Sequence, residues 1–200
     1  MNKNTIWGMI PLNKKCHWSL AGYLMGNGSW RLYGLALKFG SIMPDILVHT
    51  YWTGHKYDTT AVRVERKLTA LEQSGTWNLV NCFRLGYNLH FLEDYFTYPH
   101  NSHFDGGFIA HCWYEHKLSK AMGEYLRQAQ AAVALPASGD SIRTVLKRCH
   151  AEYMQAAPSP ENDVAYIVSA AQSVAQELFA AFSRQSISPR SLAFIARTGV

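Results

Sequence analysis

Long apolar runs, high charge and paired cysteines are all missing from this 200-residue sequence. No stretch of about 18 apolar residues occurs, so no segment is predicted to cross a bilayer. Charged residues make up only 16% of the chain and hydrophobic residues 48%, which excludes an intrinsically disordered protein. The four cysteines form no C-x-x-C pair, which argues against a cysteine zinc ribbon or a disulfide framework. The first residues lack the apolar core of a signal peptide, so we expect a cytoplasmic protein, or a secreted one if the chain is a processed form.

Acidic residues are absent before Asp45. Five cations precede this residue, whereas fourteen bases and fourteen acids balance from Asp45 onward, so the net charge of +5 belongs to the N-terminal region. This uneven distribution differs from the overall positive charge of a nucleic-acid coat protein. The basic region is suited to peripheral contact with anionic lipid or nucleic acid, although an ordinary solvated surface explains the same charges.

Strand signals are missing too, since no sustained period-two alternation occurs. Apolar residues instead recur at steps of three and four, which predicts an all-α fold, and the length suits one compact domain over residues 1–200. Pro44 is placed to open one helix, and Asp58 is placed to cap another that ends at Gly75. The remaining predicted helices cover residues 17–25, 30–39, 77–96, 108–133, 141–156 and 161–183.

Histidine is the residue in excess, with nine copies in the chain. His90 and Asp94 are four residues apart, so on a helix they lie on one face and can bind one ion. His111 and Glu115 repeat this spacing, and His100 lies between the two pairs. Imidazole nitrogens and carboxylate oxygens are ligands of hydrolytic zinc, although manganese and iron accept them as well. The row therefore predicts a metal centre of two or three ions.

Further candidate ligands precede this row. Asp45 begins a stretch that contains His49 and His55. If Pro44 opens a helix, Asp45 and His49 share one face and can chelate together, so either His49 or His55 can be the ligand. Two more histidines are placed to orient ligands or contact substrate, or else to face solvent, namely His103 and His116.

This row resembles the zinc-dependent phospholipase C family, helical metalloenzymes that include the bacterial phosphatidylcholine-hydrolysing enzymes and the clostridial alpha-toxin catalytic domain. The family pattern is H-x-x-x-D, five residues, a histidine, and then H-x-x-x-E. The same spacing is found here in His90, Asp94, His100, His111 and Glu115. The resemblance covers about residues 7–115 and implies the all-α fold that phospholipase C shares with the single-strand nucleases.

The resemblance also implies which residues hold each ion. One zinc would be held by Asp45, His55, His90 and Asp94, and a second by His100, His111 and Glu115. Asp94 would bridge to a third zinc, which the family binds through a histidine and the amine of an N-terminal tryptophan. The corresponding residues are His17 and Trp7, and Trp7 qualifies only if processing makes it the N-terminus. Asp45 is implied as the catalytic base.

The resemblance implies a zinc-dependent phosphodiester hydrolase of phospholipase C type, in which metal-activated water attacks the phosphodiester of a phospholipid or another phosphoester. A single-strand nuclease is an alternative, with nucleic acid as substrate, but that family ends its pattern in H-x-x-x-D, so Glu115 favours the phospholipase branch. Fold alone does not determine the reaction, so two more hypotheses stay open. In the first, the family scaffold is recruited to another metal-assisted reaction. In the second, the chain is a non-catalytic domain that zinc stabilises.

Overall fold

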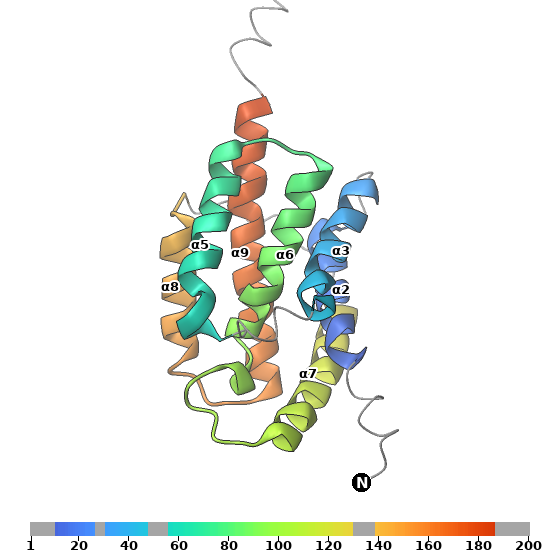
Figure 1. The fold of residues 1–200 in the computed structure, drawn as a ribbon, viewed down its shortest axis with the longest axis vertical. Helices are drawn as coiled ribbons and strands as arrows, with labels where there is room; N and C mark the ends of the chain where they lie inside the picture. Colours follow the sequence, from blue (N-terminus) through green and yellow to red (C-terminus); the bar gives the residue numbers. More distant parts are fainter. Residues whose placement is uncertain (1–10, 27–30, 48–55, 130–138, 187–200) are drawn as a thin grey trace, which may run out of the picture.

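A computed structural model describes residues 11–26, 31–47, 56–129 and 139–186, and these residues form helices with no strand among them (Figure 1). The predicted all-α fold is confirmed. The helices are α2 (Pro11–Met25), α3 (Arg31–Ile46), α5 (Tyr57–Ser74), α6 (Leu79–Tyr95), the short 3-10 helix η1 (Tyr98–His100), α7 (Phe108–Gln128), α8 (Ile142–Tyr153) and α9 (Pro160–Ser186). No helix in these ranges has both the length and the apolar character needed to span a membrane.

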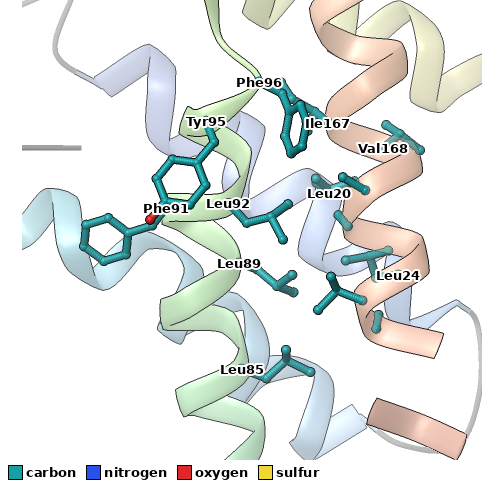
Figure 2. Packing of buried hydrophobic residues seen from close by; sticks show 14 of the residues in the cluster. Leu20, Leu24, Leu85, Leu89, Phe91, Leu92, Tyr95, Phe96, Ile167 and Val168 are labelled. Atoms are coloured by element: carbon teal, nitrogen blue, oxygen red, sulfur yellow. The ribbon is translucent and has the colours of Figure 1, made fainter. Parts of the chain in front are cut away.

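The central helix is α6, which is buried on nearly all sides between residues 85 and 95. Figure 2 shows three leucines of α6 pointing into the space between α2 and α9, namely Leu85, Leu89 and Leu92. They belong to one core cluster with Leu20 and Leu24 of α2 and Ile167 and Val168 of α9. A helix buried all round offers little water to its polar side chains, so those on α6 need partners or ligands inside the protein.

The backbones of α3 and α6 touch where two glycines cross. A Cβ atom added to Gly40 would lie 2.1 Å from the carbonyl oxygen of Phe83. One added to Gly86 would lie 2.0 Å from the carbonyl oxygen of Leu37. Only glycine permits this approach, and α3 and α6 make the most extensive helix contact in the described structure. The crossing places the last turn of α3, with Asp45, beside α6.

The longest described helix, α9, extends along the long axis of the molecule (Figure 1). It contacts α2, α5, α6, α7 and α8. Small side chains permit this close packing, since Ala170, Ala171, Val174 and Ala175 are buried there. Thus α9 packs against most of the bundle, whereas α3 packs mainly against α6 and α2.

The start predicted at Pro44 is wrong. Pro44 lies inside α3, which begins at Arg31 and ends at Ile46. Packing of α3 against α6 outweighs the preference of proline for the first turn of a helix. As a result, Asp45 lies in the last turn of α3.

The remaining helix boundaries agree more closely with the prediction. The predicted cap at Asp58 is wrong, because Lys56 is the N-cap of α5 and Asp58 lies in the first turn, where its negative charge still favours the helix. The end at Gly75 is confirmed, and this residue has a left-handed conformation with φ 53°. The rest of the predicted helices correspond to α2, α6, α7, α8 and α9, although α2 begins earlier, at Pro11.

Candidate metal centre

Two candidate ligands lie one turn apart on α6. Asn78 caps this helix, since its side-chain oxygen accepts a hydrogen bond from the N–H of Asn81 at 2.8 Å. Further along, Nε2 of His90 lies 3.4 Å from Oδ2 of Asp94. Both side chains are buried. The predicted i, i+4 pair is therefore formed inside the protein, and not on a solvated helix face.

The last turn of α3 contributes a carboxylate and a carbonyl to His90. Oδ1 of Asp45 lies 3.6 Å from Nε2 of His90. On the far side of the ring, Nδ1 of His90 donates to the carbonyl oxygen of Ser41 at 2.9 Å. A carbonyl only accepts, so the proton is on Nδ1, and in the neutral ring the lone pair is on Nε2. The nitrogen that faces the two carboxylates is therefore the one able to bind a metal.

α2 contributes His17, which is almost fully buried. Its ring lies 4.1 Å from that of His90, measured between centroids. Nδ1 of His17 lies 2.6 Å from Oε2 of Glu93, and Nε2 lies 3.8 Å from Oδ1 of Asp94. Burial lowers the pKa of His17, but the negative charges of Glu93 and Asp94 have the larger combined effect and raise this pKa to about 10. The two carboxylates therefore favour a proton on His17 when no metal is bound, whereas a metal at Nε2 requires the neutral ring.

We define His17, Asp45, His90 and Asp94 as the first group. One ligand atom from each of His17, Asp45 and His90 lies within 4.8 Å of the others. The nitrogen–oxygen distances of 3.4 to 3.8 Å within the group exceed those of hydrogen bonds. They are close to the edge of about 3.3–3.6 Å expected for a tetrahedron with zinc–ligand bonds of 2.0–2.2 Å. Nε2 of His17 forms no hydrogen bond within the described ranges, as expected of an atom that binds a metal ion. The nitrogen and oxygen atoms of the first group therefore fit zinc.

We define His100, His111 and Glu115 as the second group. His100 ends η1, and the remaining two lie one turn apart near the start of α7. Oε1 of Glu115 lies 3.2 Å from Nε2 of His100 and 2.8 Å from Nε2 of His111. Burial raises the pKa of Glu115, but the hydrogen bonds from both histidines outweigh it and lower that pKa to about 2. The carboxylate is thus ionised, as a metal ligand must be.

Asp94 acts on both groups. Although burial lowers the pKa of His100, the negative charges of Asp94 and Glu115 raise it above its usual value. Asp94 also raises the pKa of His17 in the first group. The two groups are therefore close enough for one carboxylate to act electrostatically on both.

The turn that carries His100 is held from α8 and α9. The carboxylate of Asp163, in the first turn of α9, accepts from the N–H of Tyr98 at 2.8 Å and from the hydroxyl of Tyr153 at 2.9 Å. Burial raises the pKa of Asp163 to about 6 in spite of these hydrogen bonds. After His100, the side chain of Asn101 donates to two carbonyls of the α6–η1 segment and faces Nε2 of His150 at 3.1 Å. These contacts fix η1 against α6.

The structure brings together seven of the residues singled out in the sequence, namely His17, Asp45, His90, Asp94, His100, His111 and Glu115. It places His103 and His116 on the surface, outside both groups, where their rings contact Tyr98 and Trp113. Trp7, His49 and His55 lie outside the described residues. The choice between His49 and His55 therefore stays open.

The resemblance implies that His17 binds a third ion, which Asp94 bridges to the first. The ligand atom of His17 lies in one cluster with those of Asp45 and His90, and its Nε2 faces Asp94, which is compatible with this arrangement. Sequence reasoning missed Glu93 and the carbonyl of Ser41, which hold the far nitrogens of His17 and His90. The only signal for Glu93 was its place in the polar run beside Asp94. A backbone carbonyl leaves no signal in a sequence.

Comparison with protein families gave one match. The model of a family described as "Zinc dependent phospholipase C" matches residues 6–179, which extends the resemblance beyond Glu115 through α8 and most of α9. Neither the curated proteins nor the solved structures gave a match. The family match covers most of the chain and includes every residue of both ligand groups. The chain therefore belongs to the zinc-dependent phospholipase C family.

Proposed function

We propose that this chain hydrolyses the phosphodiester bond of phospholipids at a centre of two to three zinc ions. Family membership supports the broader part of this proposal, a zinc-dependent hydrolase that acts on phosphodiesters. The substrate class and the ion count are our inference from the two ligand groups.

The observation that carries the proposal is the presence of two ligand groups, on both of which Asp94 acts electrostatically. Each group combines imidazole nitrogens with carboxylate oxygens, the donor set typical of hydrolytic zinc. The first group would bind through His17, Asp45, His90 and Asp94, and the second through His100, His111 and Glu115. The second group has only three protein ligands, and a catalytic zinc site usually keeps a position open in this way.

Zinc bound at such a centre neutralises charge on phosphate oxygens and lowers the pKa of water towards neutrality. Asp45 is our candidate for the base, because it lies at the edge of the first group and its side chain is more exposed than those of His90 and Asp94. An ionised carboxylate there can take the proton of an attacking water. His111, which is partly exposed, lies where a substrate can approach the second group.

The proposal is tested by activity and metal content together. The untagged protein is stripped with a chelator, reloaded with zinc, and assayed on phosphatidylcholine vesicles and on single-stranded DNA. We expect zinc-dependent release of the phosphorylated head group from the vesicles. Cleavage of the DNA alone would support the nuclease alternative, and a protein that binds no zinc would contradict the proposal altogether.

The role of Asp45 is tested with Asp45→Asn, which keeps the size of the side chain and removes its charge. We expect activity to fall at least about 100-fold, as is usual for loss of a general base. Asp58→Asn is the matched control, since Asp58 is exposed in the first turn of α5. An Asp45→Asn protein that binds zinc and retains full activity would disprove the assignment.

A further inference from the structure

Glu93 is a buried carboxylate that belongs to neither ligand group. It lies next to Asp94 on α6, and its side chain is only 4% exposed. Oε2 of Glu93 lies 2.6 Å from Nδ1 of His17, so this contact joins α6 to α2. Burying a carboxylate is unfavourable unless a specific partner compensates it, and His17 is the partner that the structure provides.

The contact fixes which nitrogen of His17 faces the first group. An ionised carboxylate only accepts hydrogen bonds, so Nδ1 carries a proton. In the neutral ring, the lone pair is then on Nε2, and this atom lies 3.8 Å from Oδ1 of Asp94. Nε2 of His17 forms no hydrogen bond within the described ranges. The ring is therefore held with its metal-binding atom toward Asp94.

His90 is held in the same way by a different acceptor. Its Nδ1 donates to the carbonyl of Ser41, and its Nε2 faces Asp45 and Asp94. The two rings thus present the same nitrogen to the same carboxylates. His90 has a neutral acceptor, whereas His17 has a charged one, which makes an imidazole a stronger electron donor.

We infer that Glu93 is a positioning residue, which orients His17 and fixes its Nδ1–H tautomer so that Nε2 can bind zinc in the first group. This inference rests on the proposed zinc centre. Carboxylates that hold the far nitrogen of a metal-binding histidine typically contribute about 10- to 100-fold to metal affinity. Glu93 acts through His17 and has no contact with substrate in this role.

The test compares Glu93→Ala and Glu93→Gln with the wild type. Zinc affinity is measured on chelator-stripped, untagged protein by competition with a chromophoric chelator, and nitrogen NMR reports the tautomer of His17 in the zinc-loaded protein. We expect Glu93→Ala to weaken zinc binding about 10- to 100-fold and to lose the single Nδ1–H tautomer. Glu93→Gln should bind zinc with an intermediate affinity and keep the tautomer, because its amide oxygen still accepts from Nδ1. A structural role alone would not produce this ordering.

Glu124→Gln, at an exposed position of α7, is the matched control and should bind zinc as the wild type does. If Glu93→Ala fails to fold, Glu93→Gln decides the question alone, and an unchanged zinc affinity would overturn the inference. His17→Ala separates the two levels of the argument. A wild type that binds no zinc contradicts the proposed function, whereas zinc binding that is weakened by His17→Ala but not by Glu93→Ala contradicts only the role of Glu93.

Discussion

The two ligand groups differ in how deeply they are buried. In the first group, the side chains of His17, His90 and Asp94 are at most 3% exposed, and only Asp45, at 13%, lies at the edge. In the second, His100 is 10%, Glu115 19% and His111 30% exposed. Structural zinc sites are typically closed and catalytic ones open. We therefore expect the buried residues of the first group to contribute to the stability of the fold, while Asp45 at its edge and the second group face the substrate.

The difference follows from the elements that carry the groups. The first group is drawn from α2, α3 and α6, and two of these helices touch at the glycine crossing. The second is drawn from η1 and the start of α7, with a loop between them. A site on three packed helices loses its geometry when the core shifts, whereas a site beside a loop depends on a few polar contacts.

The largest effect is expected from Gly86→Ala. The added methyl group would lie 2.0 Å from the carbonyl oxygen of Leu37, so α3 and α6 must separate. We expect the free energy of unfolding, measured by urea denaturation, to fall by about 3 kcal/mol or more. Because Asp45 lies on α3 and His90 on α6, zinc binding by the first group should be lost as well, while His100, His111 and Glu115 keep their mutual contacts.

Gly123→Ala on α7 is the control for this change. An added Cβ there meets nothing within 4 Å, and alanine favours a helix interior by about 0.8–1.0 kcal/mol over glycine. This variant should be as stable as the wild type or slightly more so. Equal destabilisation by the two substitutions would mean that the glycine crossing does not hold the first group together.

The second expected effect compares Asp94→Asn with Glu115→Gln. Each change replaces a carboxylate by an amide of similar size, Asp94 in the first group and Glu115 in the second. Asp94→Asn should reduce both zinc content and stability, because Asp94 is buried and acts electrostatically on both groups. Glu115→Gln should reduce activity at least about 100-fold but lower the free energy of unfolding less than Asp94→Asn does, since its group is partly exposed.

Zinc content, vesicle hydrolysis and urea denaturation of both variants decide whether the contrast holds. The control is Asp105→Asn, at an exposed position in the loop before α7, which should behave like the wild type. If Glu115→Gln destabilised the fold as much as Asp94→Asn does, the two groups would have the same role and burial would not separate them.

The sequence predicted the fold class and most of the candidate ligands for identifiable reasons. The 3.6-residue period of the apolar residues gave the helices, and the i, i+4 spacing placed His90 beside Asp94 and His111 beside Glu115. Local spacing of this kind needs no knowledge of the tertiary structure. The resemblance to a family then added His17, and it assigned Asp45, already a candidate from the sequence, to the same ion as His90 and Asp94.

Several features depend on tertiary contacts and were missed. Pro44 has a local preference for a helix start, but packing on α6 carries α3 past it. The sequence does not distinguish Glu93 from the other acidic residues. Only the packing of α2 against α6 places His17 in contact with it. The close approach at Gly40 and Gly86 requires the crossing of two helices that are separate in sequence. None of these features has a signature at a fixed sequence spacing.

The smallest effect is expected at His150, which supports the second group from α8. Its ring stacks on that of Tyr57 with centroids 3.4 Å apart, and its Nε2 faces Oδ1 of Asn101, the residue after His100. Burial lowers the pKa of His150 to about 4, with Asp58 opposing this shift and His103 adding to it. The unfolded chain, with a histidine pKa of about 6.5, therefore binds the proton more readily than the folded protein does.

Stability contributed by the neutral His150 ring should be present above about pH 6.5 and be lost as the pH falls towards 4. His150→Gln keeps a hydrogen-bonding group near Asn101 but does not titrate. We expect the unfolding free energy of the wild type, relative to that of His150→Gln, to decrease as the pH falls. Both proteins are measured with zinc removed at each pH. The remaining histidines titrate equally in both proteins, so they cancel in this difference. A difference that stays constant from pH 7 to 4 would show that the folded structure does not lower the pKa of His150.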